Sequence, residues 1–263
     1  MKAAVLDGIG SKFEVREVEL DKPKSGELLV KVAASGLCAS DLNAVDGKRK
    51  LVPFPAVIGH EAAGVIVEVG ADVKGFSVGD HVIMSIVPSC GTCEYCASGR
   101  PNYCATAGNA MSVGGLFDGT SRLSQNGEKL NHFLTVASFA EYVVVPASGA
   151  VVIPDEMPLD RAALISCAVL TGYGAVMNTA KVKPGSTVAI FGCGGVGLNI
   201  VQGARMAGAT TIIAVDVTQE KLDLAKKVGA THVINGATSD PVAMVKEICG
   251  GVDYAFEALG RES

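Results

Sequence analysis

A glycine-rich turn between two apolar segments constrains the fold of this chain more than any other feature. Residues 187–191 form a short β-branched and apolar run, which Gly192, Gly194 and Gly197 follow in the pattern G-x-G-x-x-G. Such a run, followed by this pattern and then a helix, predicts the start of a βαβ unit. The first glycine permits a tight turn, the second lets the backbone approach a pyrophosphate, and the third lets helix and strand pack closely.

The residues after this turn add the context that an isolated glycine pattern lacks. We expect a helix to begin near Val196, where the free N–H groups of Gly195 and Val196 and the helix dipole attract phosphate oxygens. A second apolar segment, residues 211–216, ends in Asp216, nineteen residues after Gly197. A carboxylate at this position accepts hydrogen bonds from a ribose diol and repels a 2′-phosphate. The pattern therefore predicts an NAD site, and a structural βαβ turn without a nucleotide is the alternative.

The sequence predicts two domains that differ in secondary-structure pattern, with a boundary between residues 153 and 154. Short apolar runs alternate with glycine, aspartate and proline turns in residues 1–153, which is typical of a β-rich domain. Its expected strands are 28–32, 64–69, 80–87 and 141–145. Asn126-Gly127 suits a tight hairpin turn.

Residues 154–263 alternate helical patterns with short apolar strands, which predicts an α/β domain with a parallel, doubly wound sheet. The expected strands are 187–191, 211–216, 232–234 and 252–257. Because a complete dinucleotide domain of this kind has six strands, four strands predict an incomplete domain.

Composition excludes several classes of protein. The 263 residues carry a net charge of −5 with a pI near 5.4 and no basic cluster, which argues against a nucleic-acid surface. No apolar run reaches the ~18 residues that a membrane helix needs, and the first residues lack the apolar core of a secretory signal. We therefore expect a cytoplasmic protein with no nucleic-acid or membrane partner. The eight cysteines of such a chain indicate metal binding or catalysis rather than disulfides.

Four of these cysteines, Cys90, Cys93, Cys96 and Cys104, lie within fifteen residues of one another. Four close thiolates satisfy tetrahedral zinc and exclude water from it, so the spacing predicts a structural zinc site. Clustered cysteines without a metal are a poor alternative, because this polar segment offers no core to enter. An iron–sulfur cluster uses the same ligands, but a loop beside a nicotinamide site makes it the weaker interpretation.

A second metal site is harder to see from the residues alone. His60 and Glu61 form a charged pair inside an apolar run, and their burial without a partner would be costly. This favours a site over simple packing. Cys38 and Cys167 are far from His60 in the sequence, and Cys167 lies in an apolar segment where a buried, inert cysteine is the simpler interpretation.

Several segments in a fixed order identify a family. They are Gly36-Leu37-Cys38-Ala39-Ser40-Asp41, Gly59-His60-Glu61-Ala62-Ala63-Gly64, the four-cysteine segment, Ser166-Cys167-Ala168-Val169-Leu170-Thr171-Gly172-Tyr173-Gly174, and the glycine-rich turn. Over essentially the whole chain they resemble the zinc-containing, medium-chain alcohol dehydrogenases. The resemblance implies a GroES-like catalytic domain over 1–153, with a structural zinc lobe at 90–104, and a Rossmann domain over 154–263 that is truncated at its C-terminus. It also implies that Cys38, His60 and Cys167 hold a catalytic zinc, with a fourth position open for water or substrate.

The resemblance implies further roles for individual side chains. Ser40 matches the hydroxyl that takes the proton of the alcohol, and Asp41 can accept from the far ring nitrogen of a zinc-bound histidine. Glu61 resembles a carboxylate behind the metal, and Lys221 matches a lysine that supports the adenosine ribose. Read without the family, Ser40 is a turn serine and Lys221 an exposed helix lysine.

The implied activity is reversible hydride transfer between a primary or aromatic alcohol and NAD. The alkoxide would bind the catalytic zinc, and the nicotinamide ring would lie over the metal between the domains. The aliphatic Ile86, at a position that lines the alcohol pocket, suits such a substrate. The expected partners are a small-molecule alcohol or aldehyde and, for the full-length form, further copies in a homodimer or homotetramer.

Some residues depart from the family pattern. Ala39 replaces a histidine or arginine that contacts the pyrophosphate, and Asn43 replaces a histidine that ends the proton relay. The family pattern therefore does not specify which groups carry the proton beyond Ser40. Glutathione-dependent formaldehyde dehydrogenases, which act on S-(hydroxymethyl)glutathione, resemble the chain through Gly115–Arg122, but their anion-binding arginine is absent from the uncharged residues 105–108. This thiol-dependent activity and a non-catalytic zinc- and nucleotide-binding fragment are the alternatives; zinc-free quinone reductases fit less well, because every ligand position is kept.

Overall fold

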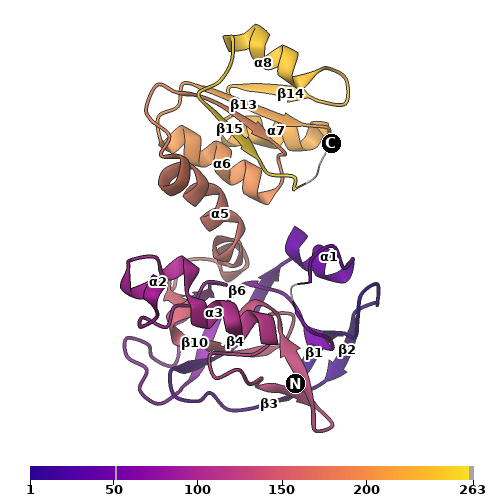
Figure 1. Cartoon of the computed structure of the whole chain (residues 1–263), viewed down its shortest axis with the longest axis vertical. Coiled ribbons are helices and arrows are strands. Elements are labelled where there is room, and N and C mark those ends of the chain that lie inside the picture. Colours follow the sequence, from indigo (N-terminus) through magenta and orange to yellow (C-terminus); the bar gives the residue numbers. More distant parts are fainter. Residues whose placement is uncertain (51, 261–263) are drawn as a thin grey trace. The chain divides into compact units, whose positions relative to one another are not determined.

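The computed structural model describes residues 1–50 and 52–260, which form two compact units (Figure 1). Unit 1 is Met1–Cys167 and unit 2 is Ala168–Ser263. This division falls after the predicted boundary because residues that follow Val152 still pack into unit 1. Ala162 and Ala163 are buried there against Ala63 and Ile83.

Unit 1 contains two β-sheets. The first has the strand order β2-β1-β5-β9-β8-β3 and the second the order β10-β4-β6-β7-β11. The strands are β1 (Lys2–Leu6), β2 (Glu14–Glu17), β3 (Glu19–Leu20), β4 (Glu27–Gly36), β5 (Ala56–Val57), β6 (Glu61–Val69), β7 (His81–Met84), β8 (Leu123–Gln125), β9 (Glu128–His132), β10 (Tyr142–Pro146) and β11 (Ala150–Val152).

Short helices join these strands. They are α1 (Ala39–Val45), α2 (Glu94–Ala97), η1 (Pro101–Tyr103), α3 (Ala105–Val113), η2 (Phe133–Thr135), η3 (Ala147–Gly149), α4 (Leu159–Ala162) and η4 (Ala163–Ser166). The predicted strands correspond to β4, β6, β7 and β10. β7 is shorter than predicted and ends at Met84, although the N–H of the next residue, Ser85, still donates to the carbonyl of Gly149.

The central pair of the second sheet is β4 with β6. Gly64 lies so close to β4 that a Cβ there would sit 2.2 Å from the carbonyl oxygen of Lys31, so only glycine permits this approach. The register pairs Gly36 at the end of β4 with Glu61 at the start of β6. The residues that follow β4 and precede β6 therefore meet at one edge of the sheet.

The Asn126-Gly127 hairpin turn is confirmed. Gln125 at the end of β8 pairs with Glu128 at the start of β9. Both turn residues have positive φ, 52° for Asn126 and 80° for Gly127. Asparagine followed by glycine tolerates this conformation at low cost, so the local sequence fixes the register of the hairpin.

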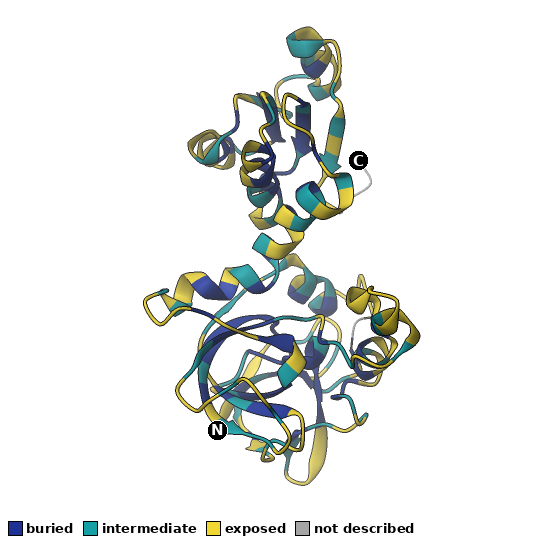
Figure 2. Ribbon diagram, turned by 90° about the vertical axis from the view of Figure 1, so that its left-hand side faces the viewer, coloured by how far each residue is buried: buried dark blue, intermediate teal, exposed yellow. Residues whose placement is uncertain are grey.

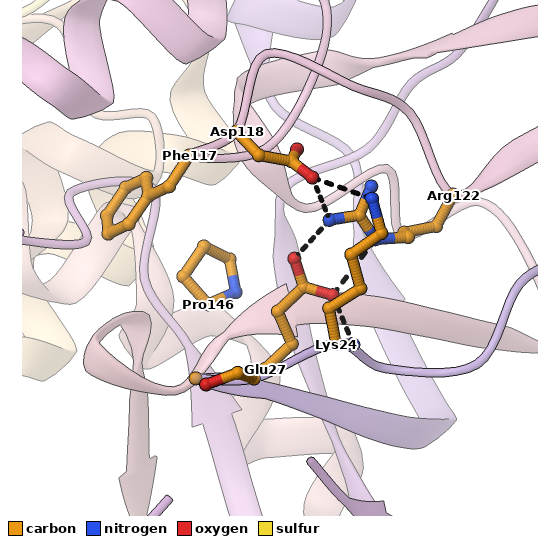
Figure 3. Close-up of a pocket in the computed structure, with 8 residues that line it drawn as sticks. Lys24, Glu27, Phe117, Asp118, Arg122 and Pro146 are labelled. Atoms are coloured by element: carbon orange, nitrogen blue, oxygen red, sulfur yellow. Dashed lines mark hydrogen bonds and ion pairs between the residues drawn. The ribbon is translucent and has the colours of Figure 1, made fainter. Parts of the chain in front are cut away.

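A buried ion-pair network ties β4 to the loop before β8 (Figure 3). The Arg122 side chain is 1% exposed and donates to both oxygens of Glu27, to Asp118 and to the hydroxyl of Thr120. Lys24 also donates to Asp118. Because such a bidentate pair is expensive to break by removing one partner, this network anchors the loop firmly.

Unit 2 is a doubly wound parallel sheet of four strands in the order β14-β13-β12-β15. The strands are β12 (Thr187–Phe191), β13 (Thr211–Asp216), β14 (His232–Asn235) and β15 (Tyr254–Glu257). The helices are α5 (Ala168–Gly174), η5 (Ala175–Ala180), α6 (Gly195–Met206), α7 (Gln219–Val228) and α8 (Pro241–Cys249). All four predicted strands are present, and β15 starts later than predicted because the carboxylate of Asp253 is bound by the N–H and hydroxyl of Thr187.

Alternate residues of the strands pack on opposite faces of this sheet. Ile190 and Ile212 face a core that includes Leu222 of α7, whereas Ala189 and Ile213 face a second core. Figure 2 shows the buried residues gathered on these strands, with exposed residues on the outer faces of the helices. Because the strand order reverses between β12 and β15, the carboxyl end of β12 is where a doubly wound sheet binds its ligand.

Within the described residues, no single helix is long and apolar enough to cross a membrane. The consecutive helical stretches Leu159–Ser166 and Ala168–Ala180 pass that test of length and composition only when taken together across a break.

Candidate metal centres and nucleotide site

Four side chains gather at the edge where β4 ends and β6 begins. One donor atom from each of Cys38, His60, Glu61 and Cys167 lies within 4.8 Å of the others. Cys38 precedes α1, His60 directly precedes β6, Glu61 is the first residue of β6, and Cys167 follows η4. The register between β4 and β6 explains how residues so distant in the sequence meet.

The His60 ring is oriented by a buried carboxylate. Its Nδ1 lies 3.0 Å from Oδ1 of Asp41, and both side chains are fully buried. Oδ2 of Asp41 accepts from the backbone N–H of Cys38 at 2.8 Å, so this carboxylate also fixes the start of α1. With Nδ1 as the donor, the lone pair of Nε2 points into the cluster. Among the described residues, Nε2 of His60 has no hydrogen-bond partner.

The charges of this cluster favour a cation. Hydrogen bonding from Cys167, together with His60 and the backbone N–H of Ser40, lowers the pKa of Cys38 to about 3 despite its burial. Burial opposes a charge on His60, but Asp41 and the sulfur of Cys38 raise its pKa to about 9. A metal bound at Nε2 would therefore take the place of a proton. Burial and the neighbouring Cys38 thiolate raise the pKa of Glu61. An unpartnered buried nitrogen beside two sulfurs is the donor set that a zinc ion requires.

Ser40 lies in the first turn of α1, two residues after Cys38, and is half-buried. Its backbone N–H faces the sulfur of Cys38. The phenyl ring of Phe133 packs edge-on against His60, with ring centroids 5.7 Å apart. Phe133 could not be predicted as a neighbour of His60, because an aromatic residue in an apolar run carries no signal of what it packs against.

The four cysteines of the lobe also lie together. The sulfurs of Cys90, Cys93, Cys96 and Cys104 lie within 4.8 Å of one another. Two of them accept backbone N–H groups: Cys104 from Cys90 at 3.3 Å, and Cys90 from Cys93 at 3.3 Å. Such N–H···S contacts stabilise thiolates, which are the form that binds metal.

The lobe is crowded with potential negative charge. The hydroxyl of Thr106 and backbone N–H groups lower the pKa of Cys90 to about 5. Desolvation and the adjacent Cys93 raise the pKa of Cys96 to about 11, which means that the four thiols resist ionising together. A divalent cation at their centre would remove this repulsion, so the residues fit a tetrahedral zinc ion.

The glycine-rich turn joins β12 to α6 as predicted. Gly192 has a φ of 98°, which favours glycine. A Cβ on Gly197 would sit 1.7 Å from the carbonyl oxygen of Gly192, whereas a Cβ on Gly194 would meet nothing within 4 Å. Gly194 therefore leaves open space in front of the N-terminus of α6, where Gly195 and Val196 begin the helix. This is the cradle that a pyrophosphate requires.

Asp216 ends β13 beside this turn and is 7% exposed. Its oxygens accept from the backbone N–H groups of Cys193 at 2.8 Å and Thr218 at 3.0 Å. Burial disfavours its charge, but these N–H groups hold its pKa below the usual value. Nζ of Lys221 lies 3.9 Å from Oδ2 of Asp216. The two residues predicted to contact the ribose are thus neighbours.

Comparison with known proteins identifies relatives for both units. The family described as alcohol dehydrogenase GroES-like domain matches residues 24–155, and the family described as zinc-binding dehydrogenase matches residues 195–263. An S-(hydroxymethyl)glutathione dehydrogenase of Synechocystis sp. is 43% identical in an alignment of 263 residues that covers 99% of this chain and 71% of the relative.

Solved structures give the same result. The alcohol dehydrogenase zinc-binding domain protein from Burkholderia ambifaria superposes with a TM-score of 0.93 at 42% identity, over 99% of this chain and 70% of that one. Benzyl alcohol dehydrogenase from Acinetobacter calcoaceticus gives a TM-score of 0.91 at 40% identity, with the same coverage of 99% and 70%. The expected plan of a GroES-like domain and a Rossmann domain is confirmed. The chain belongs to the zinc-containing, medium-chain alcohol dehydrogenases, a family of oxidoreductases that use zinc and a nicotinamide dinucleotide.

Proposed function

We propose that this protein catalyses the reversible, NAD-linked oxidation of a primary or aromatic alcohol at a zinc ion held by Cys38, His60 and Cys167. The observation that carries the proposal is the buried Nε2 of His60, which has no partner among the described residues and lies beside two sulfurs and a carboxylate. In the same proposal, Cys90, Cys93, Cys96 and Cys104 hold a second, structural zinc.

The zinc, when bound, supplies a Lewis acid that lowers the pKa of an alcohol oxygen toward neutrality. Two thiolates, from Cys38 and Cys167, balance the charge of a divalent cation, and a neutral His60 adds none. Asp41 keeps the proton of His60 on Nδ1, so Nε2 remains a lone-pair donor. The hydroxyl of Ser40 relays the proton that the alcohol loses, because it accepts that proton and passes its own to solvent water. Glu61, buried behind the ligands, tunes the charge of the site.

The dinucleotide binds at the carboxyl end of β12. The N–H groups of Gly195 and Val196 at the N-terminus of α6 face the pyrophosphate, and Gly192, Gly194 and Gly197 shape the turn. Asp216 accepts from the ribose hydroxyls, and Lys221 supports them. Asp216 supports NAD over NADP, because a buried carboxylate repels a 2′-phosphate.

The preferred substrate is a small alcohol of low charge, either aromatic or primary aliphatic. The aliphatic Ile86 and the 40% identity to a benzyl alcohol dehydrogenase support this choice. The second candidate is S-(hydroxymethyl)glutathione, which the name of the Synechocystis relative favours. That substrate carries carboxylates, yet residues 105–108 hold no cation, and the N–H groups of Arg122 already bind Glu27, Asp118 and Thr120.

A comparison of substrates on the whole protein tests the proposal. Reduction of NAD is followed by absorbance with benzyl alcohol, with ethanol, and with formaldehyde plus glutathione. We expect a kcat/KM at least tenfold higher for benzyl alcohol than for the glutathione adduct. The reverse order would replace the proposed substrate by the second candidate. Metal analysis that finds a single zinc per chain would contradict the proposed catalytic centre itself. The cytoplasmic location and the homodimer or homotetramer stay predictions.

A further inference from the structure

Cys167 lies at a non-helical break between two consecutive helices. η4 ends at Ser166 and α5 begins at Ala168, and Cys167 between them has φ −138° and ψ −69°. These angles are outside the helical region. The direction of the Cys167 side chain is therefore set by what holds the two ends of this break.

The preceding residue, Ser166, ties this non-helical position to β6, the strand that begins directly after His60. The Ser166 side chain is 2% exposed, and its Oγ lies 3.0 Å from the carbonyl oxygen of Ala62 and 2.8 Å from that of Ala163. A serine hydroxyl has one proton, so the two carbonyls share it. The bond to Ala163 is local to η4. The bond to Ala62 reaches β6, one residue after Glu61.

The contact with Ala62 links two parts of the proposed zinc site that are otherwise far apart in the sequence. His60 and Glu61 enter the cluster from the start of β6 and the residue before it, and Cys167 enters it from the non-helical position after η4. Packing of Ala162 and Ala163 on β6 residue Ala63 brings η4 near the strand. Apolar contacts between small side chains leave freedom to slide, however, whereas a buried hydrogen bond specifies a distance.

We propose that Ser166 is a positioning residue for the catalytic zinc, which holds the sulfur of Cys167 in register with Nε2 of His60 through the carbonyl of Ala62. This inference rests on the proposed function, in which Cys38, His60 and Cys167 are the ligands. Residues that orient metal ligands through a hydrogen bond typically change metal affinity 10- to 100-fold when they are removed. We expect an effect of that size from loss of the Ser166 hydroxyl.

The test compares Ser166→Ala with the wild type and with a matched control. The control is Ser121→Ala, which removes a side-chain hydroxyl bonded to the carbonyls of Leu123 and Leu130 at the β8–β9 hairpin. Zinc affinity at both sites is measured by competition with a chelator. The metal is then replaced by Co²⁺, whose absorption bands report the geometry and the sulfur ligands of the site.

We expect Ser166→Ala to bind zinc about 10- to 100-fold more weakly at the site of Cys38, His60 and Cys167. The cobalt bands of that site alone should change. Ser121→Ala should keep both affinities and the wild-type bands. Unchanged affinity and bands in Ser166→Ala would overturn the inference, as would an equal loss in Ser121→Ala.

A third variant covers the case in which Ser166→Ala does not fold. Ser166→Thr keeps the hydroxyl and should bind metal within about threefold of the wild type, well inside the range expected for its loss. A loss as large as that expected for alanine would reject the hydroxyl as the positioning group. Failure of the proposed function is recognised separately, because the wild type would then bind only one metal per chain.

Discussion

Asp41 and His60 form a fully buried hydrogen bond of 3.0 Å between a carboxylate oxygen and Nδ1. The other carboxylate oxygen of Asp41 accepts a hydrogen bond from the backbone N–H of Cys38. One side chain thus orients two of the proposed ligands. A proton held on Nδ1 leaves Nε2 as the atom that can bind a metal.

Asp41→Asn should weaken zinc binding at the catalytic site without affecting the lobe. The amide keeps an oxygen near Nδ1 but loses the charge that makes the imidazole a strong ligand, so affinity should fall about 10- to 100-fold. Competition with a chelator measures the two sites. Asp46→Asn, an exposed change at the end of the same helix, is the control. Equal zinc affinity in Asp41→Asn and the wild type would contradict the assigned role.

The Rossmann unit could be predicted from the sequence because its signals are local. The run 187–191, the three glycines and the strand that ends at Asp216 each satisfy rules that need only neighbouring residues. The structure confirms the four strands. Its unpredicted details come from side chains that meet across the sheet, such as Asp253 with Thr187, which delay the start of β15.

The catalytic cluster could not be predicted in the same way. Cys38, His60 and Cys167 come together through the β4–β6 register and through the break after η4, neither of which leaves a periodic pattern. Only the family resemblance placed Cys167 among the ligands. α3 was also missed, because Gly108 is a poor helix former and the helix depends on the lobe, where Cys104 accepts the N–H of Ala107.

Cys96→Ser should remove one metal equivalent and destabilise unit 1. A serine hydroxyl at this position cannot supply the thiolate that completes a tetrahedral sulfur site. Metal analysis should fall from two zinc ions to one, with a lower unfolding temperature. The control is Cys249→Ser in α8, where the thiol donates to the carbonyls of Val245 and Gly251 and belongs to neither cysteine cluster of the described residues. Two zinc ions in Cys96→Ser would show that Cys96 is not needed to hold the structural metal.

Two alanine substitutions should separate the roles of the glycines. Gly194→Ala adds a methyl group to open space at a φ of −77°, so the fold should be unchanged while the methyl obstructs the pyrophosphate. Gly197→Ala places a methyl group 1.7 Å from the oxygen of Gly192, which forces β12 and α6 apart. NAD titration followed by protein fluorescence or calorimetry, together with thermal unfolding, checks both variants. We expect weaker NAD binding with normal stability in the first and lower stability in the second. Normal NAD affinity in Gly194→Ala would contradict the proposed approach of the pyrophosphate.

His132 should make unit 1 sensitive to acid. Its side chain is fully buried, and its Nε2 accepts the backbone N–H of Arg122. Burial, with the nearby charges of Arg122 and Lys129, lowers its pKa to about 3. The folded protein therefore stays unprotonated at this ring while the unfolded chain takes up a proton below about pH 6.5. Stability from the neutral ring is fully present above that pH and is lost as the pH falls toward 3.

The test is His132→Gln, whose side-chain oxygen can accept the same N–H. Below pH 6.5 its free energy of unfolding should fall less steeply with falling pH than that of the wild type, and the two slopes should differ by ~1.4 kcal/mol per pH unit. Denaturant titrations between about pH 5 and 8 measure both slopes, and the two curves should run parallel above pH 7 as an internal control. Equal slopes below pH 6 would show that this histidine is protonated in the folded protein.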